Sequence, residues 1–531
     1  MTMSYHPLRI TTLSPVHIGC DEDFEPSNFV IDDGLLHALA PADLAAALDN
    51  NDKQKLQHLA DERNPIGAIQ QFFKQRRAHL AQFARQQIDV VADIAQVYEK
   101  AGIPQQQSHD GRNIYNQLRM ARTAFNPLDG TPYLPGSSLK GSIRTAWLNH
   151  LNKGKAFTGR KEDSSQLQQH LLGYSAGKFE NDPFRSVALA DAHAPEEQLA
   201  PPTRILYAIS KKKKPSERAP SELKVFLETV RETLPDAFSS ELRLTGKISW
   251  NALCDACNTF YRPQLESELR HVTFAPLLDL QWRALISTLL ANELGELIAA
   301  RQGFLLRVGK HSGAESITLD GARSIKIMGA KGQSTSYRPE TTEKRFASAT
   351  RAATSNLLPF GWIWVSGCDD AHQYLAVTVQ QQIAQHASPI LEAHAERLAA
   401  ADTRAEARRE AQRRQAEEAA ARQAKEQAKA EAAAAREQAL ATMTPNQRQI
   451  EEFHHFCQKR AEQLGKHQEA LNDKIHSRAR ELLAKARDNA EWTAEEKRAL
   501  AEVISEWLPK LVRQMDKDQL KKLKLAALRG N

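Results

Sequence analysis

Alternating hydrophobic and polar positions predict strands in two separated parts of the chain. Near the N-terminus, LRITTL (residues 8–13) alternates β-branched and other side chains until a Ser-Pro step interrupts it. NFVIDDGLLHAL (residues 28–39) follows, and its Asp33-Gly34 step is a favoured two-residue turn between apolar runs. Strand character returns after Gly303 in FLLRVG and FGWIWVS. We therefore expect a β-hairpin early in the chain and further strands late in it.

Helical periodicity dominates the sequence between these strands. From Asp43 to about Lys100, apolar side chains recur at the spacing of one buried helix face, namely Leu56, Leu59, Ile66, Ile69, Phe72 and Phe73. Between His150 and Ala300, helical stretches alternate with loops. Strands at both ends with helices between them favour an α+β fold over a repeating βαβ array.

The composition changes after about residue 390. Residues 391–440 are nearly all Ala, Glu, Arg, Gln and Lys without Gly or Pro, which predicts a long solvated helix, with a disordered linker as the alternative. A small helical module follows, because Pro445 stands at a helix start and Thr493 with Glu496 forms a capping box. We thus expect three parts: residues 1–385 with a helical insertion at about 43–125, a helix or linker at 391–441, and a module at 444–531.

Length and charge limit the class of protein. A chain of 531 residues is too long for one compact core, and a net charge of +6 with a pI near 8.9 permits a nucleic-acid partner without requiring one. The N-terminal sequence lacks the apolar core of a signal peptide, and no apolar run is long enough to span a membrane. These features predict a cytoplasmic protein.

The five cysteines include one C-x-x-C pair, Cys254 and Cys257. A structural zinc needs four ligands, and no second pair stands nearby to complete the set. Two half-buried thiols on a helix are therefore favoured over a metal or redox site. We expect no cofactor and no bound metal.

The stretch YLPGSSLKGSIRTAWL (residues 133–148) carries the candidate chemistry. Gly136 and Gly141 have the separation found in a Walker A loop, but Lys140 precedes the second glycine instead of following it, which excludes that nucleotide pocket. Gly136 allows the chain to turn, and Ser137 or Ser138 could cap the helix that follows.

The spacing within this helix predicts one apolar face and one basic face. Leu139, Ile143 and Trp147 recur every four residues and should be buried, whereas Lys140 and Arg144 share the adjacent face. Together with the N–H groups of the helix start, these cations could hold one or two phosphates. The alternative is a capped core helix with an exposed basic pair.

Four blocks in the chain resemble, in the same order, those of the RAMP superfamily of CRISPR proteins, over about residues 8 to 380. The blocks are TTLSPVHIG with FVIDDGLLHAL, YLPGSSLKGSIRTAWL, DPFRSVALADA (residues 182–192) and the glycine-containing FLLRVGKHSGAESITL. The opening SPVHIG is most similar to the family of the fifth Csm subunit, the terminal backbone subunit of type III-A effectors. Beyond about residue 390 the chain departs from the resemblance.

The resemblance implies a modified RRM-like, ferredoxin-type core that binds a guide RNA, caps the filament at the 3′ end of the guide and supports guide maturation and antiviral defence. It implies other type III-A subunits as partners, the neighbouring backbone RAMP subunit and a guide-maturation nuclease among them. The stacking aromatics of an RRM are not evident, so backbone and shape contacts should dominate. The residues expected at the RNA are His17, Gly136, Ser137, Ser138, Lys140, Gly141, Arg144, Arg307, Gly309, Lys310, His311 and Gly313.

Two other functions stay open. The first is a metal-dependent endoribonuclease, with His17 or His311 as base and a magnesium ion held by acidic residues after the first strand, namely Asp21, Glu22, Asp23, Asp32 and Asp33. Acidic residues in such a loop are also common solvated groups, and Asp33 is explained by its turn, so we expect no catalytic residue. The second is an adaptor that recruits other effector subunits through the C-terminal helices.

Overall fold

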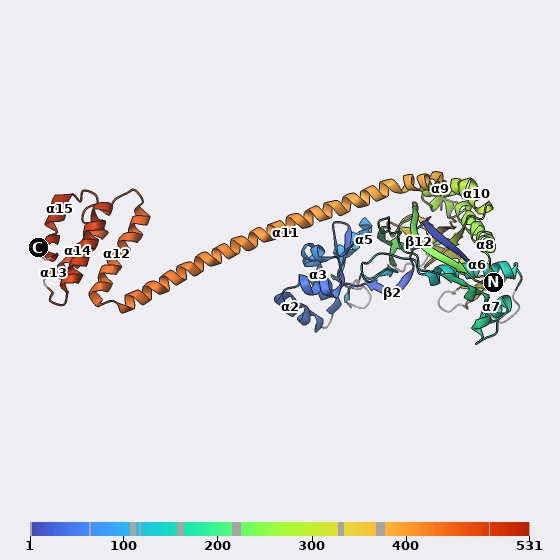
Figure 1. Cartoon of the computed structure of the whole chain (residues 1–531), viewed down its shortest axis with the longest axis horizontal. Helices are drawn as coiled ribbons and strands as arrows, with labels where there is room; N and C mark the ends of the chain where they lie inside the picture. Colours follow the sequence, from blue (N-terminus) through green and yellow to red (C-terminus); the bar gives the residue numbers. More distant parts are fainter. Residues whose placement is uncertain are drawn as a thin grey trace. The chain divides into compact units, whose positions relative to one another are not determined.

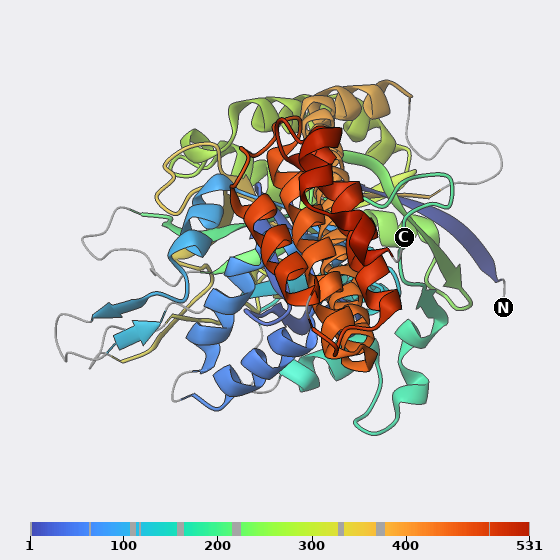
Figure 2. The same cartoon turned by 90° about the vertical axis from the view of Figure 1, so that its left-hand side faces the viewer.

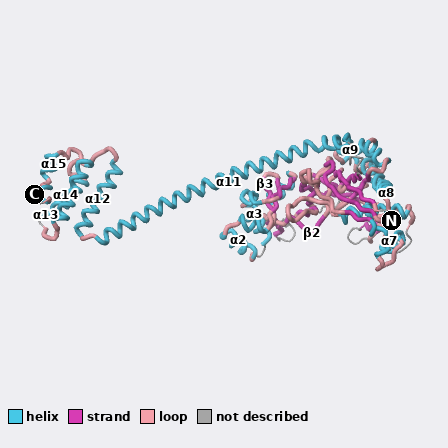
Figure 3. Tube along the Cα trace, viewed as in Figure 1, coloured by secondary structure: helices cyan, strands magenta, loops and turns pink. Residues whose placement is uncertain are grey.

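The computed structural model describes residues 3–62, 65–106, 113–115, 118–156, 164–214, 225–327, 334–367, 377–487 and 489–529. They pack into two compact units, which we call the N-terminal unit (residues 1–406) and the C-terminal unit (residues 407–531). Figure 1 shows strands together with helices in the N-terminal unit and helices in the C-terminal unit, and Figure 3 separates the two kinds of element by colour.

A five-stranded antiparallel sheet forms the first part of the N-terminal unit. Its spatial order is β13-β18-β1-β12-β9. In chain order, β1, helix α6, β9, β12, helix α8 and β18 make the βαββαβ arrangement of a ferredoxin-like fold, with β13 added at the edge, antiparallel to β18. The bounds are β1 (Ser4–Thr12), α6 (Gly136–Asn152), β9 (Val187–Leu189), β12 (Leu234–Leu244), α8 (Trp250–Arg270), β13 (Gly303–Arg307) and β18 (Trp362–Gly367).

The largest hydrophobic core lies between this sheet and its helices. α6 packs on α8, and α8 packs on β13. Alternate residues of β1, such as Leu8 and Ile10, are buried with Leu253 and Phe260 of α8. Two further helices, α9 (Leu280–Ala291) and α10 (Glu293–Ala299), add Trp282, Ile286 and Leu294 to the same core.

A second, mixed sheet completes the N-terminal unit. Seven of its strands follow the order β2-β8-β11-β10-β5-β4-β3, and β16 pairs with both β10 and β17. The predicted hairpin is confirmed, because β3 and β4 pair antiparallel around Asp33 and Gly34, which have φ of 50° and 78°. The strands are β2 (Gly19–Phe24), β3 (Phe29–Asp32), β4 (Leu35–Ala38), β5 (Gln86–Val90), β8 (Met120–Thr123), β10 (Thr203–Lys212), β11 (Phe226–Val230), β16 (Glu343–Ser348) and β17 (Leu358–Pro359).

The region from Asp43 to Lys100 is not wholly helical as the periodicity predicts. β5 interrupts it, pairing antiparallel with β4 and parallel with β10, and buries Ile88 and Val90. Beyond it, the predicted insertion at about 43–125 also contains β6, β7 and β8, so it is mixed. The helices are α1 (Pro41–Ala47), α2 (Asn50–Ala60), α3 (Pro65–Gln75), α4 (Arg77–Leu80) and α5 (Ala92–Lys100).

Short elements fill the rest of the described N-terminal unit. Two small antiparallel sheets pair β6 with β7 and β14 with β15. The elements are β6 (Pro104–Gln106), β7 (Asn113–Tyr115), β14 (Ile325–Ile327), β15 (Ser336–Arg338), α7 (Ser164–Leu172) and the 3₁₀ turns Ala81–Phe83, Phe179–Asn181, Pro183–Ser186, Ala275–Leu277 and Ala314–Ile317.

Helix α11 (Val377–Thr442) begins before the predicted residue 391, and its first part is docked rather than solvated. Val379, Ile383 and Ala387 are buried in the large core. Farther along, Arg397 Nε and Nη2 donate to the two oxygens of Asp89 at 2.9 and 2.8 Å, and His394 Nδ1 lies 2.9 Å from Asp89 Oδ2. This part of α11 therefore belongs to the packed N-terminal unit, while most side chains from Ala407 to Leu440 are exposed.

The C-terminal unit has a hydrophobic core of its own, built from residues such as Phe453, Leu483, Ile504 and Leu508. Its helices lie side by side in Figure 2. The predicted capping box is confirmed, with Thr493 and Glu496 in reciprocal hydrogen bonds at the start of α14. The elements are α12 (Pro445–Leu464), α13 (Lys474–Arg487), α14 (Ala494–Leu511), α15 (Lys517–Lys522) and the 3₁₀ turn Leu525–Leu528. The α+β class with long C-terminal helices is thus confirmed.

A search of the described helices for one long and apolar enough to cross a membrane finds none.

Candidate nucleic-acid interface

Helix α6 starts at Gly136, and the first N–H of the helix is capped by an aspartate that lies outside the motif. The backbone N–H of Gly136 donates to Asp191 Oδ1 at 2.7 Å, and no side chain caps the helix from Pro135, the residue before it. The predicted cap by Ser137 or Ser138 is therefore wrong, because both serines already lie inside the helix. Asp191 comes from the block DPFRSVALADA, so two of the resembling blocks meet here.

Gly136 is required by the closeness of another backbone. A Cβ at this position would lie 2.5 Å from the carbonyl oxygen of Leu189 and 2.7 Å from that of Ala190. Gly141, by contrast, is exposed, and a Cβ there would meet nothing within 4 Å. The first glycine therefore serves packing, while the second leaves an open patch on the helix surface.

The two predicted faces of α6 differ in how well they match the structure. Leu139 and Ile143 are buried as expected, whereas Trp147 is only partly buried and stacks on His150 at 5.6 Å between ring centroids. On the basic face, Arg144 Nη1 pairs with Asp182 Oδ2 at 2.8 Å. Lys140 is partly exposed, and its burial lowers its pKa from the ordinary value. Lys140 thus lies within reach of the charge of Asp182, but it is Arg144 that forms the ion pair with this aspartate.

Contacts far apart in the sequence bring the late loop against α6 and the loop after β1. Ser142 Oγ donates to the carbonyl oxygen of Arg307 at 3.1 Å, and the N–H of Lys310 donates to that of His17 at 2.8 Å. Gly309 has φ of 76°, and a Cβ there would lie 2.1 Å from the His17 oxygen. Three of the predicted segments therefore meet at one place, and Gly309 is the residue that allows the closest of these approaches.

His17 is fully buried beneath this junction. Its Nδ1 lies 2.7 Å from the carbonyl oxygen of Glu228, and its Nε2 is buried without a partner among the described residues. Burial is the main reason that its pKa falls to about 4, with the charge of Lys310 acting in the same direction. His17 is therefore neutral at pH 7 and positions the loop from within.

Arg307 is also buried, where it belongs to an ionic network under the late loop. Its Nη1 pairs with Glu268 Oε1 at 2.8 Å, and its Nε donates to the carbonyl oxygen of Phe360 at 3.0 Å. Lys344 and the indole N–H of Trp362 complete the network on Glu268, at 2.7 and 2.8 Å. Glu268 itself was not among the predicted residues, because nothing in its helical sequence context distinguishes it from a surface glutamate.

The exposed part of the late loop is positively charged. Lys310 is exposed, and His311, with φ of 68°, packs its ring 5.4 Å from that of Phe360. Burial, with the nearby charges of Arg345 and Lys310 acting in the same direction, lowers the pKa of His311 to about 3. Gly313 follows with φ of 87°. Ser137, Lys140 and Gly141 on the first turns of α6 and Lys310 in the late loop are among the predicted residues of these segments that are exposed or partly exposed, and we call these four the junction surface.

The acidic residues of the ribonuclease alternative do not converge. Asp21, Glu22 and Asp23 are exposed along β2, while Asp32 lies 3.6 Å from Arg77 and Asp33 lies 2.8 Å from Arg404. Within the part of the chain that the structure describes, no group of three or more His, Cys, Asp or Glu side chains is arranged to hold a metal ion. The arrangement therefore offers no assembled site for metal-activated water.

Cys254 and Cys257 are both buried in α8, and neither forms a disulfide. Burial raises the pKa of both thiols far above the ordinary value, so they are protonated at pH 7.

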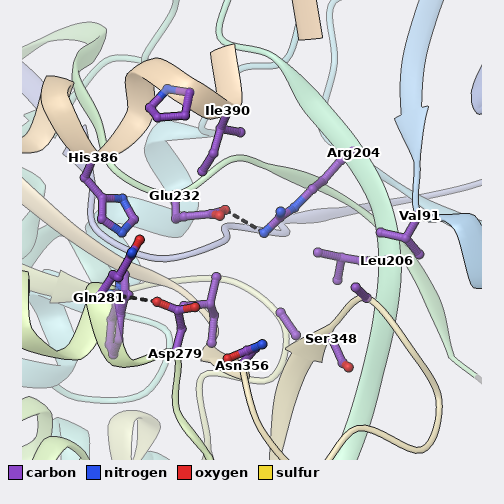
Figure 4. A pocket seen from close by; sticks show the side chains of 15 residues that line it. Val91, Arg204, Leu206, Glu232, Asp279, Gln281, Ser348, Asn356, His386 and Ile390 are labelled. Atoms are coloured by element: carbon purple, nitrogen blue, oxygen red, sulfur yellow. Dashed lines mark hydrogen bonds and ion pairs between the residues drawn. The ribbon is translucent and has the colours of Figure 1, made fainter. Parts of the chain in front are cut away.

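A cavity of about 290 Å³ opens elsewhere in the N-terminal unit, between β10, β16, the start of α9 and α11 (Figure 4). Arg204 and Glu232 form an ion pair of 2.7 Å on one side, and Asp279 Oδ1 accepts from the N–H of Trp282 at the start of α9. None of the residues predicted at the RNA lines it. The cavity is thus separate from the junction surface.

Comparison with known proteins shows which part of the chain is similar to a known family. Residues 9–251 match the RAMP superfamily, so this part of the chain is a RAMP-superfamily region. The late loop lies outside the matched residues. The CRISPR system Cms protein Csm5 of Methanocaldococcus jannaschii is 28% identical over 163 residues, which cover 30% of this chain and 35% of that protein. The chain therefore contains a region that matches the RAMP superfamily, and it is similar to Csm5 over about a third of the length of that protein.

Two solved structures also align with the chain. One is a chain of the Csm–crRNA–target RNA ternary complex of a type III-A CRISPR–Cas system, with a TM-score of 0.40, 16% identity, and coverage of 68% of this chain and 99% of that chain. The other is the crystal structure of T. onnurineus Csm5, with a TM-score of 0.39, 15% identity, and coverage of 67% and 99%.

The two glycines of α6 should respond oppositely to alanine. Gly136→Ala places a methyl group against the backbone at Leu189 and should lower the free energy of unfolding by about 1–3 kcal/mol. Gly141→Ala adds a methyl group in open space on a helix and should raise it by about 0.5–1 kcal/mol. Urea unfolding followed by circular dichroism measures both. Equal changes for the two variants would contradict the placement of these glycines.

Proposed function

We propose that this protein is a non-catalytic, CRISPR RNA-binding subunit of a type III-A (Csm) ribonucleoprotein effector. It would cap the effector filament at the 3′ end of the guide RNA and support guide maturation and antiviral defence. Its partners would be the guide RNA and other type III-A subunits, especially the neighbouring backbone RAMP subunit, with a maturation nuclease as a further partner.

One observation carries the proposal: three segments that are distant in the sequence meet at the junction surface. The loop before β2, the first turns of α6 and the late loop after β13 are joined through Ser142, Arg307, Lys310 and His17. In the sequence these are the segments that resemble the RAMP blocks. Two of the three lie within the matched region 9–251.

The junction surface has the chemistry that an RNA backbone needs. Lys140 and Lys310 supply ammonium groups, and Lys140 lies near the start of α6, where the helix dipole is positive and the Asp191 carboxylate already accepts from the first N–H. Gly141 leaves the helix surface open to a phosphate. Since Arg144 is engaged by Asp182 and Arg307 by Glu268, these two arginines would hold the surface in shape instead of contacting phosphates directly.

The proposal is tested with Lys140→Glu/Lys310→Glu. Binding of a labelled CRISPR-repeat RNA is measured by fluorescence polarisation across a salt series, with and without magnesium. The double variant should bind more weakly, with a salt slope shallower by about 1.4, since each phosphate contact on a single strand contributes about 0.7. The matched control is Lys155→Glu/Lys178→Glu, which makes the same charge change at two exposed lysines of the N-terminal unit.

Equal affinity of the double variant and the control would overturn the proposed site. Intact RNA after incubation with magnesium is expected, and cleavage that persists in the purified protein would instead support the ribonuclease. The variant Arg144→Glu is avoided, because it would place a second carboxylate against Asp182 and confuse misfolding with lost binding.

A further inference from the structure

The C-terminal unit ends in an exposed basic surface that the proposed function does not use. Residues 510–529 contain seven Lys or Arg and two Asp, a net charge of +5, compared with +6 for the entire chain. Most of the excess positive charge of the protein is therefore concentrated in this short segment. We call its exposed lysines Lys517, Lys521, Lys522 and Lys524 the basic patch.

The fold holds these lysines outward. Leu523, Leu525 and Leu528 are buried in the core of the C-terminal unit and fix the segment to it. Lys517 and Lys521 are four residues apart in α15 and so share one side of the helix. Arg487, from the end of α13, donates through Nη2 to the carbonyl oxygen of Leu523 and brings another cation beside the patch.

In the C-terminal unit some basic side chains are paired with acidic ones, whereas three of the four patch lysines form no ion pair among the described residues. Outside the patch, Lys485 pairs with Glu481, Lys510 with Glu506 and Arg460 with Glu469. In the patch, Asp516 is occupied in accepting the N–H groups of Asp518 and Gln519, and Asp518 lies 3.7 Å from Lys521. Among the described residues, Lys517, Lys522 and Lys524 form no ion pair.

We propose that the basic patch is a second RNA-binding surface, which contacts phosphates without reading sequence. Unpaired, exposed ammonium groups on a folded surface attract polyanions, and binding releases the counterions condensed on the nucleic acid. Contacts between lysines and phosphates carry no sequence information, so the patch should bind any single strand. We infer RNA as the polyanion because the proposed function is RNA binding, and the inference rests on that proposal.

The test uses the full chain and a labelled oligouridine, whose sequence is unrelated to a CRISPR repeat. Lys517→Glu/Lys521→Glu/Lys522→Glu should weaken binding and make the salt slope shallower by about 1.4–2.1, two to three contacts at about 0.7 each. The matched control is Lys459→Glu/Lys466→Glu/Lys474→Glu, an identical charge change at three exposed lysines of the same unit. Should charge reversal disturb folding, judged by circular dichroism, the triple glutamine variant of the patch replaces it.

The outcomes separate this inference from the proposed function. Weaker binding in the patch variant but not in the control supports the patch, whatever Lys140→Glu/Lys310→Glu does. If the patch variant binds oligouridine as well as the control variant does, the inference of RNA binding at the patch is overturned. The proposal for the junction surface is not affected by this result, because Lys140→Glu/Lys310→Glu tests it separately. If the patch variant keeps RNA binding but loses binding to poly-L-glutamate, the surface suits an acidic protein partner and the RNA inference is overturned.

Discussion

Replacing Glu268 with alanine should lower the free energy of unfolding by about 3–5 kcal/mol, the range for breaking a buried ion pair. The side chains of Glu268 and Arg307 are each only 2% exposed. Removing the carboxylate leaves Arg307 and Lys344 without their anionic partner and Trp362 without its acceptor. Urea unfolding measures the loss. Glu266→Ala is the control, since Glu266 forms a partly exposed pair with Arg262 on the same helix and should change stability by no more than about 0.5 kcal/mol.

The same network should make stability fall at acid pH. Burial alone would raise the pKa of Glu268, but Arg307 and Lys344 lower it to about 2, below its ordinary value of 4.5. The stabilisation is therefore present above pH 4.5 and is lost as the pH falls from 4.5 toward 2. Glu268→Gln should remove this part of the pH dependence. An unchanged acid limb in that variant would contradict the role of Glu268.

Replacing Asp89 with alanine should release the first part of α11 and lower the free energy of unfolding of the N-terminal unit by about 3–5 kcal/mol. Asp89 is 4% exposed and accepts from Arg231, His394 and Arg397. Although burial opposes ionisation, these partners hold the pKa of Asp89 well below its usual range. Without the carboxylate, Arg231 is left buried and unpaired, and α11 loses its polar attachment to β5.

Hydrogen–deuterium exchange distinguishes this mechanism from a general loss of stability. Amides from Val379 to Arg397 should exchange faster in Asp89→Ala relative to those of α14, which has a separate core. Asp402→Ala changes an exposed aspartate on α11 and should leave both segments as in the wild type. Unchanged protection of α11 in Asp89→Ala would show that the buried apolar residues and the hydrogen bonds of Gln380, Gln382 and His386 are enough to hold the helix.

Local sequence patterns correctly predicted those elements whose structure depends on residues that are close together in the sequence. The Asp33-Gly34 turn, the buried stripe of Leu139 and Ile143, and the capping box of Thr493 depend on residues within a few positions of each other. β5 was missed because its strand conformation depends on pairing with β4 and β10, which no short window contains. The docking of α11 was missed for the same reason, since Asp89 lies about 300 positions before its partners.

In the candidate site too, local sequence patterns could be read from the sequence, whereas contacts between distant residues could not. The sequence identified the segments that meet, including Lys140, Gly141 and Lys310. It did not separate these residues, of which Lys140 is partly exposed and the other two are exposed, from His17 and Arg307, which are buried by contacts with Glu228 and Glu268 from distant elements. Asp182 and Asp191 were quoted within their block, but only the fold shows that one engages Arg144 and the other the start of α6.

The central claim is that the junction surface contacts RNA, and photo-crosslinking tests it most directly. The full chain is irradiated with a CRISPR RNA that carries 4-thiouridine, and crosslinked peptides are identified by mass spectrometry. The account predicts crosslinks within residues 137–144 and 309–313, with or without further crosslinks at the basic patch. Recovery of those two segments unmodified, while crosslinks form elsewhere on the N-terminal unit, would contradict it.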